Sequence, residues 1–275
     1  MPSSRNELLS IPCNRAVHRP ILFCGEIGSQ ATFEDTPVSV LLHWLGMTSV
    51  PIFKSLYRIL VPTPVRTSRT VAWLKARLLP HDWIYDAEFY ATSVEGPARR
   101  SAASIAATIV DDLKPTAVID VGCGTGALLS ALRERGCRVC GLEYADAALV
   151  HCRARDLDVE KFDLENDEFP ANRRFEVAIS MEVAEHLPQK TADRYVDLLT
   201  RLAPVILFTA ASPGQGGTDH VNEQPPSYWI AKFRERGFEH ERDRSQRWSD
   251  TWKAAADVES WYYENLMIFR RTPDR

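Results

Sequence analysis

The sequence predicts an α/β protein with a doubly wound, mostly parallel sheet. Three observations lead to this prediction. From residue 97 onward, short apolar runs alternate with segments of helical periodicity. A glycine-rich turn directly follows the first apolar run, which is where a doubly wound sheet binds its ligand. The chain has 275 residues, 45% hydrophobic and 25% charged, so it is long enough to bury one such core.

Each expected element has a local signal. Residues 98–112 form an alanine-rich helical pattern that Pro115 ends, and Gly136 closes the helix that follows the glycine turn. Alternating strands and helices imply right-handed crossovers and a sheet covered on both faces. In chain order we expect helix 98–112, strand 117–121, helix 127–135, strand 138–142, helix 146–155, strands 159–162 and 175–180, helix 191–202, strand 205–209, helix 226–236, a strand near residue 238 and a last strand at 265–270.

Residues 1–95 show no such alternation, so we predict an N-terminal, largely helical accessory segment there and the main domain at 96–275. Helices are expected at 38–45 and 70–79. Residues 36–81 contain no Asp or Glu but six Lys and Arg residues. A solvated basic face explains this composition, and contact with an anionic surface or a phosphorylated substrate is the alternative.

The start of the chain lacks the basic and apolar pattern of a secretory signal, and no apolar run has the length of a membrane span. We therefore expect a cytoplasmic protein. Cys137 and Cys140 lie three residues apart in an expected strand, where their side chains point to opposite faces. These two cysteines are predicted to pack in the core and not to bind a metal.

The glycine-rich turn carries the most specific signal. Gly122, Gly124 and Gly126 permit positive φ and a close approach of the backbone, so main-chain N–H groups can surround a ligand. Their Gly-x-Gly-x-Gly spacing differs from the Gly-x-Gly-x-x-Gly of dinucleotide-binding proteins. With Asp120 two residues earlier, the turn resembles motif I of the class I S-adenosylmethionine-dependent methyltransferases.

This resemblance implies S-adenosylmethionine as the cofactor and a seven-stranded sheet whose last strand is antiparallel. Glu143, at the end of the second strand, is placed to accept hydrogen bonds from the ribose. Asp163 resembles the residue that receives the adenine amino group, and Asp120 is expected near the ammonium of the methionine moiety. The residues expected to contact the cofactor are Asp120, Gly122, Cys123, Gly124, Gly126, Glu143, Tyr144, Phe162, Asp163, Leu164, Ser180 and Met181.

Two other classes remain open at this point. An NAD-dependent oxidoreductase has the same sheet and a glycine loop, although its third glycine comes one residue later than Gly126. A non-catalytic protein that binds the cofactor as a scaffold is the third class.

The fourth expected strand leads into a turn rich in Glu and His. If this turn is helical, Glu182, Glu185 and His186 share one face. His220, in the loop after the next strand, is expected to approach the same place. The four residues resemble the metal site of small-RNA 2′-O-methyltransferases of the Hen1 type, and the Glu-x-x-Glu-His part resembles ubiquinone-biosynthesis O-methyltransferases.

This cluster has two possible chemistries and one structural alternative. A divalent metal (Mg, Mn or Zn) held by Glu182, Glu185, His186 and His220 would bind the acceptor hydroxyl and lower its pKa. Without a metal, His186 or His220 would remove the acceptor proton. In the structural alternative, His186 only ends the strand and His220 is a loop residue.

The acceptor is expected to be a small molecule methylated on a hydroxyl, such as a secondary metabolite, a sugar or a quinone- or lipid-like precursor. Metal-dependent RNA 2′-O-methylation is the alternative, and the formal net charge of −4 argues against it. The glycine-rich run 214–217 is expected to fold over the substrate. Most C-terminal aromatic residues are expected in the core, with some lining the acceptor pocket, and Tyr85 and Tyr90 are expected to reach the cofactor.

Overall fold

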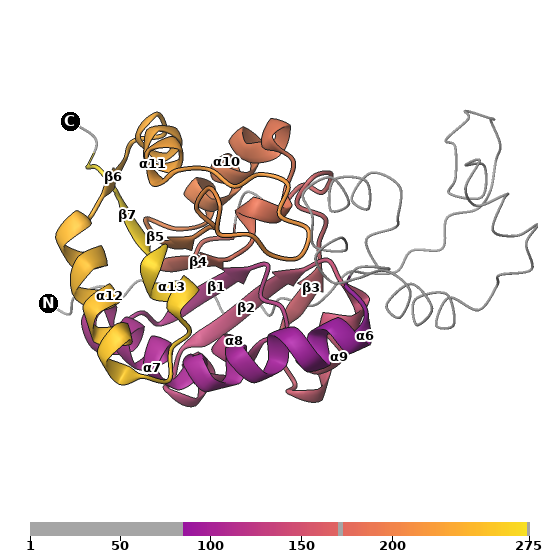
Figure 1. The fold of residues 1–275 in the computed structure, drawn as a ribbon. Coiled ribbons are helices and arrows are strands. Elements are labelled where there is room, and N and C mark those ends of the chain that lie inside the picture. The colour runs from indigo at the N-terminus through magenta and orange to yellow at the C-terminus, as the bar shows by residue number, and fades with distance from the viewer. Residues whose placement is uncertain (1–84, 170–172, 274–275) are drawn as a thin grey trace, which may run out of the picture. The chain divides into compact units, whose positions relative to one another are not determined.

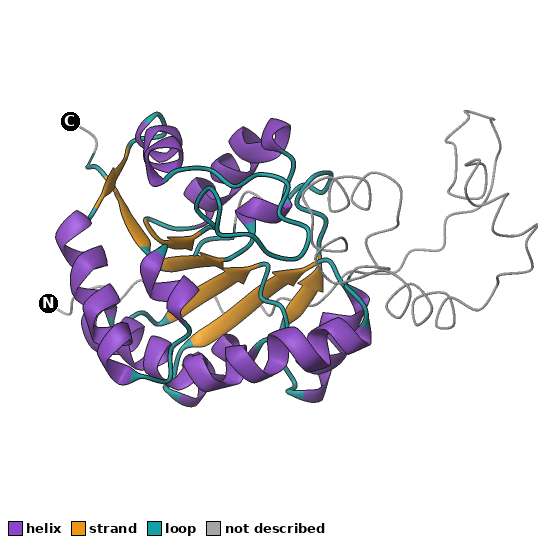
Figure 2. Cartoon of the chain, viewed as in Figure 1, coloured by secondary structure: helices purple, strands orange, loops and turns teal. Residues whose placement is uncertain are grey.

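The computed structural model describes residues 85–169 and 173–273, which belong to one compact unit. Its centre is a seven-stranded sheet of order β3-β2-β1-β4-β5-β7-β6 (Figure 2). Strand β7 is antiparallel to both of its neighbours, and the other paired strands are parallel. The predicted fold class is therefore confirmed. The strands are β1 (Ala117–Val121), β2 (Arg138–Glu143), β3 (Val159–Lys161), β4 (Val177–Met181), β5 (Val205–Thr209), β6 (Phe238–His240) and β7 (Met267–Arg271).

Two helical layers cover the two faces of this sheet (Figure 1). One layer contains α7, α8 and α12, whose apolar side chains pack with Val118 of β1. The other contains α10 and α11, which pack with Ile119 and Val121 of the same strand. The described helices are α6 (Ala87–Phe89), α7 (Glu95–Leu113), α8 (Ala127–Glu134), α9 (Asp146–Ala154), α10 (Ala192–Leu202), α11 (Pro226–Arg234), α12 (Arg242–Ala255) and α13 (Ser260–Glu264).

Strand β1 is buried along its whole length, Asp120 included, as its largely apolar sequence predicts. Successive residues of a strand point to opposite faces, so β1 contributes to both cores. Cys137 and Cys140 likewise fall in opposite core clusters, which agrees with their predicted packing role. The chain order of the strands reverses at β1, because β2 and β3 lie on one side of it and β4 and β5 on the other. The carboxyl end of β1, at this switch point, is the expected ligand site.

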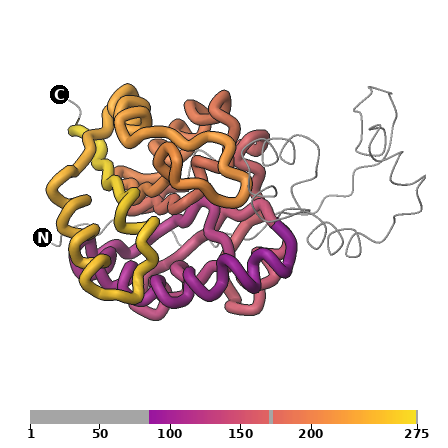
Figure 3. The backbone as a smooth tube through the Cα atoms, viewed as in Figure 1, coloured from indigo at the N-terminus to yellow at the C-terminus, as the bar shows by residue number. Residues whose placement is uncertain are grey.

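The sequence pattern missed α12 and α13. Helix α12 is mostly polar, and its apolar signal consists of Trp248 and Trp252, one helical turn apart. Both indoles lie against α7, where their Nε1 groups donate to Asp112 Oδ2 at 2.8 Å and to Thr108 Oγ1 at 3.0 Å. The backbones of α12 and α7 lie side by side (Figure 3). Tertiary packing therefore stabilises a helix whose sequence alone gives little amphipathic signal. Helix α13 spans five residues, too few for a periodic pattern.

Several predictions for the N-terminal third fall outside the described residues. These are the helices at 38–45 and 70–79 and the basic surface at 36–81. The proposed division into 1–95 and 96–275 stays a prediction for the same reason. In the described ranges, no helix is long and apolar enough to cross a membrane.

We predict that Gly141 of β2 cannot accept a side chain without loss of stability. A Cβ there would lie 2.8 Å from both Cys123 Sγ and Leu129 Cδ1 and 2.9 Å from Val159 Cγ2. Because such overpacking typically costs about 1–3 kcal/mol, Gly141→Ala should lower the free energy of unfolding by that amount. Urea titration measures the change.

Gly96→Ala in α7 is the matched control. Its Cβ would meet only Arg100 Nη1, at 3.4 Å. Replacement of a helical glycine by alanine stabilises by about 0.4–1 kcal/mol. Equal urea midpoints for the two variants would contradict the described packing of β2.

Candidate functional site

A cavity of about 720 Å³ lies at the carboxyl ends of β1, β2 and β4. The glycine turn forms its floor. The N–H groups of Gly122 and Cys123 both donate to Leu142 O, at 2.8 and 3.1 Å, so the turn is fastened to the end of β2. Gly122 has φ of 77°, and a Cβ on it would lie 2.5 Å from Val183 Cγ2. This position therefore requires glycine for both its conformation and its contacts.

Glu143 is a buried carboxylate that lines the cavity beside the glycine turn. It is 7% exposed, and its two oxygens accept hydrogen bonds from Gly124 N–H and Ala145 N–H, both at 2.8 Å. Burial raises the pKa of Glu143, and the backbone donors oppose that rise. Glu143 thus holds the glycine turn in place as well as facing the cavity.

The cavity reaches ten of the twelve predicted cofactor residues: Asp120, Gly122, Cys123, Gly124, Glu143, Tyr144, Phe162, Asp163, Leu164 and Met181 line it. Gly126 and Ser180 do not line it. Gly126 precedes α8 with φ of 75° and packs against Leu157 and Cys152, and Ser180 is fully buried against the hydroxyl of Tyr195. Gly126 and Ser180 therefore pack beneath the residues that line the cavity.

The segment after β4 differs from the expected helix. Glu182 has φ of 55°, and a 3₁₀ turn begins only at Ala184 and ends at His186. The prediction that Glu182, Glu185 and His186 share a helical face is therefore wrong. The Glu182 carboxylate instead accepts hydrogen bonds from Asn265 Nδ2 and Gln215 Nε2, both at 3.2 Å.

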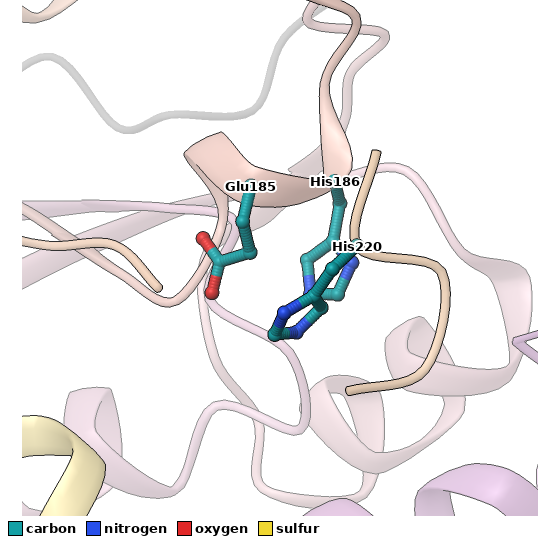
Figure 4. Close-up of side chains that lie close together, drawn as sticks. All are labelled: Glu185, His186 and His220. Carbon is teal, nitrogen blue, oxygen red and sulfur yellow. The ribbon is translucent and has the colours of Figure 1, made fainter. Parts of the chain in front are cut away.

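Glu185, His186 and His220 nevertheless come together on one side of the cavity (Figure 4). Each residue has one atom that could bind a metal, a carboxylate oxygen or an imidazole nitrogen, and these three atoms lie within 4.8 Å of one another. The two imidazole centroids are 5.0 Å apart. Glu182 is not a member of this three-residue group. His220 reaches it from the loop after β5, as the strand order predicts.

Glu185 is fully buried, neither of its carboxylate oxygens accepts a hydrogen bond from an N–H or O–H group of the described residues, and its side-chain contact is with the Glu182 carboxylate. Burial raises its pKa well above the ordinary value, and the neighbouring Glu182 raises it further. Backbone N–H groups of Glu185 and Ala211 oppose this shift without reaching normal hydrogen-bond geometry. A buried carboxylate in this state is costly unless a proton, a cation or a ligand compensates it.

His186 is held by the N-terminal part of the described chain. Its Nδ1 lies 3.0 Å from the hydroxyl of Tyr85 and 3.3 Å from the carbonyl oxygen of Asp219. Tyr85 also donates to Asp219 Oδ2 at 3.4 Å. The position of Tyr85 beside His186 could not be derived from periodicity, because this contact joins residues 101 positions apart.

Helix α7 supplies a second set of residues that the sequence pattern did not reveal. Its small side chains Ala98, Ser101 and Ala102 line the cavity, where they allow the helix to approach closely. Trp261 and Tyr262 also line it, whereas Trp229, Trp248 and Trp252 are buried in the core. The C-terminal aromatic residues are thus divided between the core and the cavity wall, as predicted.

Residues 94–204 match the family model described as "Methyltransferase domain". The ubiquinone biosynthesis O-methyltransferase of Nitrosomonas europaea is 29% identical over 165 residues, which cover 57% of this chain and 64% of that protein. The corresponding enzyme of Idiomarina loihiensis is 36% identical over 90 residues, 30% of this chain and 36% of that protein. The chain thus spans less than two thirds of the length of these relatives.

Two solved structures share the fold. The sugar N-methyltransferase KedS8 from Streptoalloteichus sp ATCC 53650 aligns with a TM-score of 0.50 and 15% identity, covering 69% of this chain and 93% of that one. The amino pentose methyltransferase CalS10 from Micromonospora echinaspora aligns with a TM-score of 0.50 and 18% identity, covering 67% and 97%. At these identities the likeness concerns the fold.

Asp120 provides a test of the electrostatics of the cavity. Burial and then the nearby Glu143 raise its pKa from 3.8 to about 7. The folded protein therefore keeps a proton that the unfolded chain releases, so this group lowers stability as pH rises from about 4 to 7. Asp120→Asn removes this effect. The free energy of unfolding of Asp120→Asn minus that of the parent protein should therefore increase by roughly 2–4 kcal/mol from pH 4 to pH 8.

Chemical denaturation across this pH range measures the difference. Asp111→Asn, an exposed change on α7, is the control and should leave the pH dependence unchanged. Parallel stability curves for Asp120→Asn and the parent protein would contradict the raised pKa.

Proposed function

The chain contains a class I S-adenosylmethionine-dependent methyltransferase domain, and we propose that it methylates a hydroxyl group of a small molecule. One observation carries this proposal. A single cavity joins the glycine turn and Glu143, at the ends of β1 and β2, to Glu185, His186 and His220. Donor and acceptor sites of a methyl transfer must adjoin in this way, because the acceptor oxygen has to lie in line with the sulfur–methyl bond.

The charge of the cavity favours a small, non-anionic acceptor. In the described part of the chain, the lining residues include several carboxylates and neither Lys nor Arg. An RNA acceptor requires basic side chains along its phosphates. The names of the curated relatives, which are O-methyltransferases, agree with a hydroxyl acceptor.

In the proposed reaction, a new oxygen–carbon bond forms while the sulfur–methyl bond breaks, and S-adenosylhomocysteine leaves. The acceptor hydroxyl must lose its proton during this step, so a group beside it has to accept that proton. His186 and His220 line the acceptor side and have the chemistry for this task. Apolar and aromatic residues such as Leu187, Phe89 and Trp261 complete the wall and limit access of water.

We further propose that Glu185, His186 and His220 hold a divalent cation. The observation that favours it is the fully buried Glu185 carboxylate, whose oxygens face the Glu182 carboxylate and accept no hydrogen bond from an N–H or O–H group of the described residues. One carboxylate and two imidazoles suit Mn²⁺ or Zn²⁺ better than Mg²⁺. Such a cation would lower the pKa of an acceptor hydroxyl.

We predict that Glu143→Gln weakens cofactor binding. The change removes the negative charge and one of the acceptors that hold Gly124 N–H and Ala145 N–H. Loss of a charged hydrogen bond of about 1.5–3 kcal/mol corresponds to a roughly 10–100-fold lower affinity for S-adenosylhomocysteine. Isothermal titration calorimetry measures it, with Glu134→Gln on the exposed face of α8 as the control.

The same titration with NAD tests the alternative class. Binding of NAD without binding of S-adenosylhomocysteine would refute the methyltransferase assignment. An unchanged affinity in Glu143→Gln would refute the role given to that carboxylate.

We predict that the parent protein binds one Mn²⁺ per chain and that Glu185→Gln lowers this affinity at least about tenfold, since the anionic ligand is lost. Electron paramagnetic resonance of free Mn²⁺ during titration gives the affinity without any acceptor. Glu165→Gln, which also lines the cavity, is the control. If Mn²⁺ and Zn²⁺ show no saturable binding, the cation is excluded and a histidine base remains.

A further inference from the structure

The loop between β5 and α11 is fastened on two sides around His220. The N–H groups of Val221 and Asn222, directly after the histidine, both donate to Glu185 O, at 2.9 and 3.0 Å. On the other side, the carboxylate of Glu223 accepts from Gly214 N–H at 2.8 Å and from Gly216 N–H at 2.7 Å. The loop therefore fixes the backbone of His220 against the 3₁₀ turn that carries Glu185.

The His220 ring is also fixed. Its Nδ1 lies 3.2 Å from Glu223 Oε1, and the two side chains are 12% and 10% exposed. The ring packs directly against Gly217, because a Cβ at this position would overlap the imidazole around Nε2. A small residue at 217 and an acidic residue at 223 thus act on opposite nitrogens of one histidine.

Glu223 is the acceptor in its contact with His220. Each of its two carboxylate oxygens accepts a backbone N–H, from Gly214 and from Gly216, and hydrogen bonds of this kind favour the ionised carboxylate. An ionised carboxylate has no proton to donate, so Nδ1 must carry the hydrogen. In a neutral imidazole with a proton on Nδ1, the lone pair is on Nε2.

We propose that Glu223 is a positioning residue that holds His220 in the Nδ1–H tautomer, with the electron pair of Nε2 available on the Gly217 side of the cavity wall. Nothing in the sequence pattern singled out Glu223. An oriented imidazole of this kind serves equally as a metal ligand and as a proton acceptor. The importance of this tautomer for catalysis rests on the proposed function, whereas the tautomer itself does not.

The first test reads the tautomer directly and needs neither acceptor nor metal. The full chain is labelled with ¹⁵N-histidine, treated with EDTA and examined by long-range ¹H–¹⁵N correlation at a pH where His220 is neutral. His220→Asn assigns the signals. We expect the Nδ1–H form in the parent protein, a shift toward the Nε2–H form in Glu223→Ala, and recovery of the Nδ1–H form in Glu223→Gln, whose amide oxygen can accept the same hydrogen bond.

The second test measures the consequence for the cluster. If the cation site exists, Glu223→Ala should weaken Mn²⁺ binding about 10–100-fold, as for other residues that orient a ligand. In a His220→Asn background the same change should have little further effect, within about twofold, because Glu223 acts through that histidine. Gly217→Ala, which displaces the ring but keeps Glu223, should reproduce the loss.

Several outcomes separate this inference from the proposed function. An Nε2–H tautomer in the parent protein, or the same tautomer ratio in Glu223→Ala, overturns the inference even if methyl transfer is demonstrated. Absence of Mn²⁺ binding in the parent protein overturns the cation but leaves the tautomer result valid. Binding of S-adenosylhomocysteine by each variant shows that the domain has folded, and Glu264→Ala, an exposed cavity residue, should leave the His220 signals unchanged.

Discussion

The structure depends on the close approach of three strand ends at one edge of the sheet. The backbone after β1 contacts the last residues of β2 through Leu142 O and the turn after β4 through Val183. Only glycine at position 122 allows both contacts, because a side chain would collide with Val183 and the residue has positive φ. This constraint places the cofactor turn beside the Glu- and His-rich turn, and the remaining features of the site follow from it.

The two halves of the cavity use buried carboxylates in opposite ways. Glu143 is satisfied by two backbone N–H groups, so it stabilises a preformed loop. Glu185 is equally buried but its oxygens have no such donors in the described part of the chain. A buried carboxylate that faces another carboxylate is costly unless a proton, a cation or a ligand compensates it. The contrast between these two glutamates is the physical reason to place binding on one side and acceptor activation on the other.

Much of the fold could be predicted because its signals are local. The bounds of β1 and β5 follow directly from apolar runs between turns, and the glycine spacing with Glu143 predicted the edge of the sheet at which the cavity lies. The missed features depend on contacts that are distant in sequence. Tyr85 meets His186 across the fold, α12 is stabilised by two tryptophans against α7, and the positive φ of Glu182 removed it from the expected helical face.

The central claim is that one cavity brings the methyl donor to the Glu185, His186 and His220 group. A crystal structure of the full chain with S-adenosylhomocysteine tests it most directly. We expect the ribose at Glu143 and the sulfur directed toward His186 and His220, with space for an acceptor between them. A sulfur directed away from these histidines, or a ligand bound away from the glycine turn, would contradict the account.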